Sequence, residues 1–261
     1  MEIRILGSVE ARVNDLPVEL RSERARRLLA LLARQPFEFV ADDFLIDRVW
    51  DDDRPVRPRD ALYTCASRLR QALRGSRGRP ADLLSRRRGG YLLSVDPQAV
   101  DLHRFRFLVR SARDAVRRAE RTPALDLFDQ ALALWRGTPL LDLGSSWSDR
   151  VRVGLERELL SVRVDRSQLA LSLGRHLESV PSLYQLAEEH PLDEAIAELL
   201  IQALYRSGRQ GESLACFASI RQRLVQELGD GPGASLHQLH SRVLRRDPSL
   251  HVAASHTSSG T

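Results

Sequence analysis

The chain has 261 residues, of which 43% are hydrophobic and 29% charged, as in ordinary globular proteins. The length allows one or two domains, and the composition favours neither a disordered nor a fibrous chain. No apolar run approaches the roughly 20 residues that cross a bilayer, and the N-terminus does not resemble a secretory signal. We therefore expect no membrane partner. Cys65 and Cys216 are far apart in sequence, which predicts reduced thiols in a cytoplasmic protein and no disulfide framework.

The positive charge is concentrated in one segment. All 40 basic residues are arginine, and the whole chain carries a net charge of +5. Residues 54–88 hold eleven arginines against Asp60 and Asp82, a net charge of +9, whereas residues 96–261 are balanced. Biased codon usage explains the absence of lysine, but it does not explain why the excess falls in one segment. Such a segment is typical of a surface that binds a polyanion.

The first 95 residues predict a small α+β domain that begins with three short antiparallel strands. Apolar residues alternate with polar ones around Ile3 and Ala11, a turn follows at Asn14-Asp15, and a third strand is expected over residues 18–20.

Three helices are expected to follow. Ser22 caps the first helix, which Pro36 ends. The second helix covers residues 42–50 and has acidic residues near its N-terminus. Pro58 suits the first position of the third helix, which continues to residue 74, where Gly75 stops it.

The third helix has an apolar and a polar face. Its apolar stripe, expected in the core, consists of Leu62, Cys65, Ala66, Leu69, Ala72 and Leu73. Its other face carries polar and basic residues, with Arg68 at the border: Arg59, Tyr63, Thr64, Ser67, Arg70, Gln71 and Arg74. A loop rich in Gly and Arg comes next, and then a predicted β-hairpin with the tip Arg86-Arg87-Arg88-Gly89-Gly90.

This order of helix, turn, helix and basic hairpin predicts a winged helix-turn-helix domain. One helix fits the major groove of DNA, and a two-stranded wing can reach the adjacent minor groove. Arginine suits both tasks, because its planar fork bonds guanine edges or phosphates with two nitrogens. Arg86, Arg87 and Arg88 alternate faces on a strand, so one or two of them are expected to reach DNA. Trp50 and Tyr91 are expected in the core.

From residue 101 onward the pattern predicts helices alone, over residues 102–120, 122–136, 147–173, 176–189, 192–207, 210–228 and 233–246. Leu173-Gly174-Arg175-His176 and Ser207-Gly208-Arg209-Gln210 match at an offset of 34 residues, which is the tetratricopeptide period. The expected domains are therefore a winged helix over 1–95, a tetratricopeptide-like all-α domain over 98–248 and a disordered tail over 249–261. The short break between the two domains predicts that they touch.

Motifs in both halves resemble one family. Those in the first half are Arg59-Asp60-Ala61-Leu62, Ser67-Arg68-Leu69-Arg70-Gln71-Ala72-Leu73 and Arg87-Arg88-Gly89-Gly90-Tyr91-Leu92-Leu93. Those in the second half are Val100-Asp101-Leu102, Ala131-Leu132-Ala133-Leu134-Trp135-Arg136-Gly137, Glu189-His190-Pro191-Leu192 and Ala203-Leu204-Tyr205-Arg206-Ser207-Gly208-Arg209-Gln210. Over roughly residues 1–248 the chain resembles the Streptomyces antibiotic regulatory protein family, in its small form without an ATPase domain. That family joins a response-regulator-like winged helix to a bacterial transcriptional activation domain.

The resemblance implies a transcription activator for secondary-metabolite genes. Such an activator binds directly repeated sites in double-stranded promoter DNA as a tandem homodimer, and it recruits RNA polymerase through the sigma factor and other subunits. The DNA-binding residues that this implies are Arg57, Arg59, Tyr63, Thr64, Ser67, Arg68, Arg70, Gln71, Arg74, Arg86, Arg87 and Arg88. Two positions depart from the family pattern: Arg57 stands where a capping Ser or Thr is frequent, and Cys65 where a larger residue is frequent.

Other readings of the same residues stay open. Arg59 and Arg70 could pair with neighbouring acidic residues. The chain could instead be a tetratricopeptide-like interaction scaffold with a basic nucleic-acid-binding patch, or a phosphate-handling enzyme built on its arginine clusters. The sequence offers no nucleophile–base pair, and its histidines are not spaced as metal ligands are. Neither catalysis nor a cofactor is therefore expected. Binding to promoter DNA over random DNA would separate an activator from a scaffold.

Overall fold

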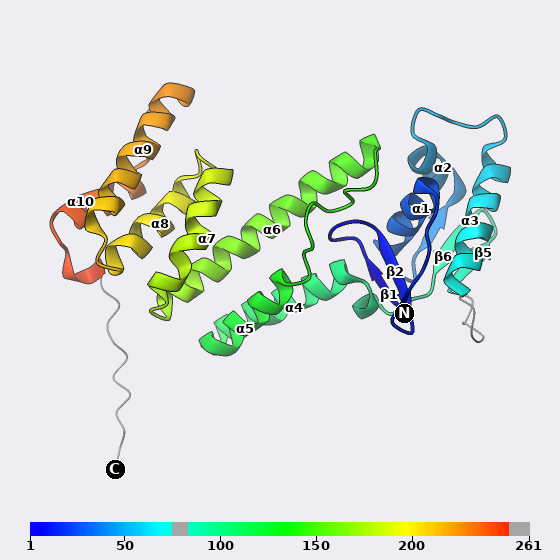
Figure 1. Cartoon of the computed structure of the whole chain (residues 1–261), viewed down its shortest axis with the longest axis horizontal. Helices are drawn as coiled ribbons and strands as arrows, with labels where there is room; N and C mark the ends of the chain where they lie inside the picture. Colours follow the sequence, from blue (N-terminus) through cyan, green and yellow to red (C-terminus); the bar gives the residue numbers. More distant parts are fainter. Residues whose placement is uncertain (75–82, 251–261) are drawn as a thin grey trace, which may run out of the picture. The chain divides into compact units, whose positions relative to one another are not determined.

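A computed structural model of the chain describes residues 1–74 and 83–250 (Figure 1). The chain divides into two compact units, Met1–Val162 and Arg163–Thr261, with the boundary inside helix α6 (Ser146–Ser172). Gly75, the Gly- and Arg-rich loop after it and residues 251–261 of the expected tail lie outside the described residues. Residues 249 and 250 of that expected tail form part of a 3-10 helix, η2 (Pro248–Leu250), in which Leu250 is buried.

The first unit begins with a three-stranded antiparallel sheet of order β1-β2-β3. Its strands are β1 (Glu2–Arg4), β2 (Glu10–Val13) and β3 (Leu16–Pro17). The expectation of a third strand at residues 18–20 was wrong. Asn14 and Asp15 both have positive φ and form a two-residue turn, so Val13 pairs directly with Leu16 and the strand begins two residues earlier.

Three helices follow this sheet at the expected positions and pack against one another: α1 (Glu23–Ala33), α2 (Asp42–Trp50) and α3 (Pro58–Arg74). The Ser22 hydroxyl accepts a hydrogen bond of 3.1 Å from the Ala25 N–H, and so caps α1 as expected. Leucines of α1 and α3 form the core between these helices and are completely or almost completely buried: Leu28, Leu29, Leu32, Leu62 and Leu69.

A second sheet of order β4-β6-β5 completes the winged helix. The hairpin strands β5 (Leu84–Arg87) and β6 (Gly90–Leu93) form as expected, but β4 (Phe39–Ala41) was not expected. A Cβ atom on Gly90 would lie 2.3 Å from the Val40 carbonyl oxygen, so only glycine lets β4 approach β6 this closely.

The rest of the first unit is helical: η1 (Pro97–Ala99), α4 (Asp101–Arg117), α5 (Arg121–Leu132) and the first part of α6. The carboxylate of Asp101 ties α4 to the first sheet, because it accepts hydrogen bonds of 2.8 Å from the Ile5 N–H and 2.9 Å from the Leu6 N–H. Burial raises the pKa of Asp101 to about 6, and these N–H donors, with Arg136, act in the opposite direction.

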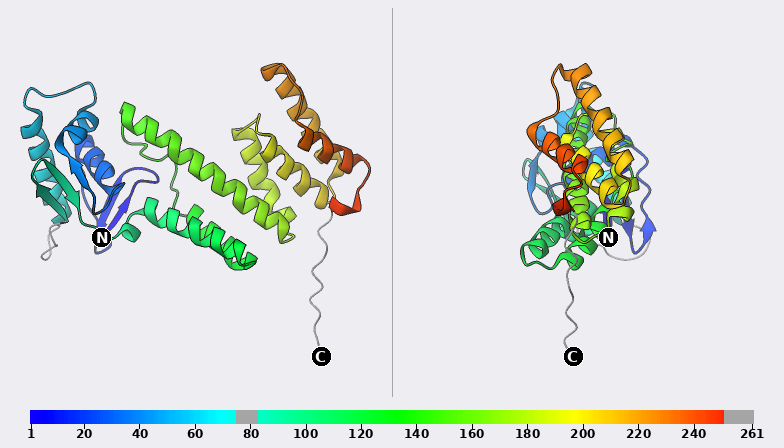
Figure 2. Two further views of the ribbon diagram at one scale, coloured as in Figure 1. Left: turned by 180° about the vertical axis from the view of Figure 1, so that it is seen from behind. Right: turned by 90° about the vertical axis from the view of Figure 1, so that its left-hand side faces the viewer.

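The second unit contains paired helices, α7 (His176–Glu189), α8 (Glu194–Arg206), α9 (Gln210–Leu228) and α10 (Ala234–Leu244), seen from two further sides in Figure 2. Gly174 and Gly208, at corresponding points of the 34-residue repeat, both adopt positive φ two residues before a helix begins. Tyr205, Phe217, Ile220 and Leu236 share the core of this unit. No helix in the described part of the chain is long and apolar enough to cross a membrane.

Candidate nucleic-acid interface

Helix α3 buries one face and exposes the other, as the sequence predicts. Leu62, Cys65, Ala66, Leu69 and Leu73 are buried, whereas Ala72 is only half-buried. The opposite face exposes seven residues expected at DNA: Arg59, Tyr63, Thr64, Ser67, Arg68, Gln71 and Arg74. The structure thus brings together on one helix face most of the residues chosen from the sequence.

Two arginines of the expected site, Arg57 and Arg59, lie at the start of α3. Arg57 is exposed, and its carbonyl oxygen accepts a 3.1 Å hydrogen bond from the Ala61 N–H, which supports the first turn without a Ser or Thr cap. An Nη2 atom of Arg59 lies 3.7 Å from Asp43, and both side chains are exposed. Ion pairs this exposed are weak, so the pairing leaves Arg59 able to turn toward a phosphate.

Arg70 differs from its neighbours on α3. It is half-buried, and its Nε donates a 2.9 Å hydrogen bond to the Leu84 carbonyl oxygen at the start of the wing. Through this hydrogen bond Arg70 helps to hold the wing against α3.

The three arginines of the wing are not equivalent. Arg86 forms two hydrogen bonds to the carboxylate of Asp42, one of them 2.8 Å long, and its guanidinium lies 4.6 Å from the ring centroid of Tyr91. Asp42 is only 5% exposed and Tyr91 only 1%, so this group holds the wing onto the start of α2. The hydrogen bonds to Asp42 raise the pKa of Arg86, and burial raises the pKa of Tyr91.

Arg87 and Arg88, in contrast, are exposed at the wing tip, next to Gly89 with φ of 81°. The tip therefore offers two arginines to a groove, while Arg86 is engaged within the protein.

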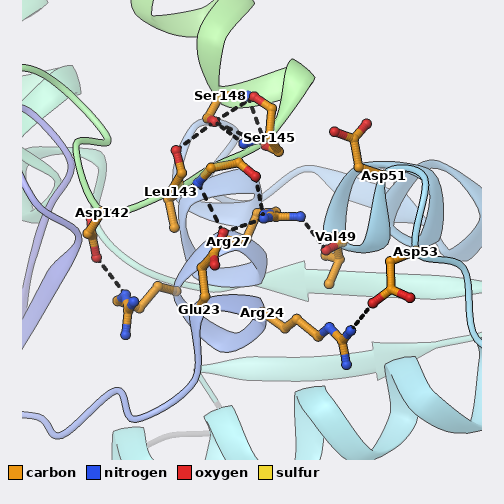
Figure 3. A network of polar contacts seen from close by, with 12 residues as sticks. Glu23, Arg24, Arg27, Val49, Asp51, Asp53, Asp142, Leu143, Ser145 and Ser148 are labelled. Atoms are coloured by element: carbon orange, nitrogen blue, oxygen red, sulfur yellow. Dashed lines mark hydrogen bonds and ion pairs between the residues drawn. The ribbon is translucent and has the colours of Figure 1, made fainter.

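A network around Arg27 supports α1 and α2 from the side of the segment that precedes α6 (Figure 3). Arg27 is 7% exposed and donates hydrogen bonds to the carbonyl oxygens of Val49, at 2.7 Å, and Gly144, at 3.1 Å, and to Glu23. The Gly144 N–H donates back to Glu23 at 3.0 Å. The network thereby fixes α1 and α2, the two helices against which α3 packs.

Sequence reasoning missed both Arg27 and the Asp42 partner of Arg86. The i,i+4 spacing of Glu23 and Arg27, beside the leucines of α1, is a signal that could have indicated a buried arginine. The partners Gly144 and Asp42 are 117 and 44 residues away, and no local pattern indicates such pairings.

Two family matches define the class of protein. Residues 17–93 match the C-terminal domain of transcriptional regulatory proteins, and residues 100–244 match the bacterial transcriptional activator domain. A winged helix joined to such a domain is a transcription regulator, and the expected order of a winged helix and a tetratricopeptide-like helical domain is confirmed.

The chain is 36% identical to the transcriptional regulator RedD of Streptomyces coelicolor, over 97% of this chain and 73% of that protein. It is also 36% identical to the regulatory protein DnrI of Streptomyces peucetius, over 96% of this chain and 94% of that protein. The solved structure of Mycobacterium tuberculosis EmbR in complex with a low-affinity phosphopeptide has a TM-score of 0.88 and 27% identity. The match covers 95% of this chain and 65% of that one. The chain belongs to the Streptomyces antibiotic regulatory protein family and is a DNA-binding transcription activator.

Proposed function

We propose that this activator binds directly repeated sites near promoters as a tandem pair of protomers and recruits RNA polymerase through the sigma factor and other subunits. The genes that it controls would belong to a secondary-metabolite pathway. The observation that carries the proposal is the exposed face of α3, which presents Arg59, Ser67 and Arg68 beside a wing tip with Arg87 and Arg88 exposed. This arrangement suits simultaneous contact with a major groove and the next minor groove.

Within this proposal the expected DNA-binding residues divide by position. The middle of the exposed face of α3 would contact base edges, through Tyr63, Thr64, Ser67, Arg68 and Gln71. The residues at the ends of the helix would contact phosphates: Arg57, Arg59 and Arg74. Arg87 and Arg88 would enter the minor groove, whereas Arg70 and Arg86 would chiefly hold the wing in place, because their side chains bond to Leu84 and Asp42.

We also propose a DNA-binding domain over residues 1–95 and an activation domain over residues 98–248. The change from mixed to purely helical structure at η1 and the two family matches, over 17–93 and 100–244, support this division. The proposed function requires no catalytic group and no cofactor.

The test is footprinting on promoters of the genes next to this one, followed by mass measurement of the complex on a full site. We expect two protected segments in direct repeat and two protomers per site. One protomer on a full site, or a palindromic footprint, would contradict the tandem pair. Equal affinity for promoter and random DNA would instead favour an interaction scaffold with a basic patch.

Recruitment of polymerase is tested separately, by transcription in vitro from the protected promoter with purified RNA polymerase. We expect transcript yield to rise with the full chain. A chain that protects the promoter but leaves yield unchanged would contradict the activation mechanism while leaving DNA binding intact.

A further inference from the structure

A second concentration of arginine lies in a pocket of the first unit, apart from the DNA-binding residues. The pocket has a volume of about 350 Å³ and is lined by the end of α1, by α2, by α4 and by the first half of α6. None of the residues expected at DNA lines it. Its volume falls within the range of small-molecule sites, roughly 300–1,000 Å³.

The lining of this pocket is strongly positive. Arg34, Arg48, Arg106 and Arg150 line it, and Glu158 is the one acidic residue of the described chain that does so. Glu158 already accepts two hydrogen bonds from Arg106, at 2.9 and 2.6 Å. The positive charge of the other arginines is therefore not neutralised by any acid of the pocket lining.

Arg34 has a buried nitrogen atom, Nε, that lacks a hydrogen-bond partner among the described residues. Burial lowers the pKa of Arg34, and repulsion from Arg106 adds to this effect. A buried cationic donor without a partner costs free energy, and an anion in the pocket would recover that cost.

Apolar side chains complete the wall. The guanidinium of Arg34 lies 5.8 Å from the ring centroid of Trp147, and that of Arg48 lies 3.5 Å from the ring centroid of Phe44. Leu155 adds an apolar surface from α6. Convergent cationic donors beside aromatic and aliphatic walls suit a molecule that has one anionic end and one flat apolar end.

We propose that this arginine pocket, lined by Arg34, Arg48, Arg106, Arg150 and Trp147, binds a small organic anion. A phosphate or carboxylate group of the ligand is held by the arginines, and its planar body packs against Trp147. The inference rests on the pocket alone and is independent of the proposed mode of DNA binding. Since the end of α1, α2, α4 and α6 all line the pocket, a bound ligand links the helices of the winged helix to those that follow it in the first unit.

The test uses the full chain and three probes of similar shape in titration calorimetry: phenyl phosphate, phenylacetate and the neutral benzyl alcohol. We expect one molecule of an anionic probe to bind per chain and no binding of the alcohol. Whichever anion binds more tightly identifies the preferred anionic group.

Variants identify the site. Arg48→Gln and Arg150→Gln remove cations from the pocket rim, and we expect each to weaken binding of the anion about tenfold. Arg157→Gln is the matched control: Arg157 is an exposed arginine of α6 that does not line the pocket, and its loss should change the affinity by less than about twofold.

Two results would overturn the proposal. The first is an absence of binding by both anions at millimolar concentration. The second is unchanged affinity for the anion in Arg48→Gln and Arg150→Gln. If the wild-type chain binds neither anion, and both variants lose affinity equally for all DNA sequences, the pocket is a contact for DNA phosphate instead.

Discussion

The exposed arginines of α3 and the wing tip contrast with two arginines of the same winged helix that bond to other parts of the protein. Arg68 and Arg87 are exposed and belong to the surface proposed to contact DNA, whereas Arg27 and Arg86 each satisfy buried oxygen atoms of the protein. Arg86 and Arg87 are adjacent in sequence, yet Arg86 pairs with the buried Asp42. Burial and partners, and not the density of arginine in the sequence, therefore separate residues that support the fold from residues that can bind DNA.

The largest expected effect comes from removing a buried arginine. Arg27→Ala leaves the Val49 and Gly144 carbonyl oxygens and the Glu23 carboxylate without their donor. We expect the free energy of unfolding to fall by about 3 kcal/mol, measured by urea denaturation. The control is Arg24→Ala, which removes an exposed arginine paired with Asp53 and should cost less than about 1 kcal/mol. Equal losses in the two variants would contradict a special role for the buried position.

A pH dependence is expected from Asp101. Burial raises its pKa in the folded chain to about 6, above the ordinary value of 3.8, so the folded state holds the proton more tightly than the unfolded state. Its contribution to stability is therefore fully present below the ordinary pKa and is lost as the pH rises through about 6. At its steepest the loss is about 1.4 kcal/mol per pH unit.

Denaturation curves of the wild-type chain, recorded at several pH values between 3.8 and about 6, check this expectation. Asp101→Asn cannot titrate, so its stability should show a smaller slope against pH in the same interval. A wild-type stability that rises over the interval would show that the hydrogen bonds from Ile5 and Leu6 outweigh burial.

A smaller loss of stability is expected in the wing. Arg86→Ala leaves the buried Asp42 unpaired, and we expect a cost of about 1–2 kcal/mol, because Arg86 is itself partly exposed. Arg88→Ala, at the exposed wing tip, is the matched control and should leave the melting temperature unchanged. Hydrogen exchange of the β5 and β6 amides measures the effect directly. Unaltered exchange in Arg86→Ala would show that Asp42 does not hold the wing.

The smallest effects are expected for single arginines at the edge of the DNA surface. Arg74→Ala should weaken binding to all sequences alike and lower the salt slope by about 0.9, because its contact would be with phosphate. Arg87→Ala should weaken binding most where the flanking minor groove is narrow and A·T-rich. Isotherms at several salt concentrations, on duplexes that differ only in the flank, measure both effects. An equal loss of affinity for the duplexes with either flank would show that Arg87 contacts the DNA phosphates and does not enter the minor groove.

Much of the fold could be predicted because its signals are local. The start of α3 at Pro58 and the cap of α1 at Ser22 are encoded by neighbouring residues, and both were correct. Strand β4 was missed because it has only three residues and exists through its pairing with β6, about fifty positions away along the chain. The start of β3 was misplaced because the two-residue turn, and not the apolar pattern, sets where pairing resumes.

The candidate site shows the same limit. Helical periodicity was enough to predict which face of α3 is exposed, since that face follows from spacing within one element. It could not distinguish Arg86 from Arg87, or Arg27 from Arg24, because those differences depend on Asp42 and Gly144, which folding brings near. Long-range pairing of charges has no signature in a single sequence.

Whether the exposed face of α3 reads DNA sequence can be determined with the variant Arg68→Ala. The measurement is a pair of binding isotherms for the variant and the wild-type chain, on the footprinted site and on a scrambled duplex. The control is Arg245→Ala, which removes an exposed arginine just after the end of α10. For Arg68→Ala we expect a loss of about 1–3 kcal/mol of binding free energy on the footprinted site, a much smaller loss on the scrambled duplex and an unchanged melting temperature. If Arg68→Ala binds both duplexes as tightly as the wild-type chain does, or loses the same affinity on both, then the exposed face of α3 does not read DNA sequence.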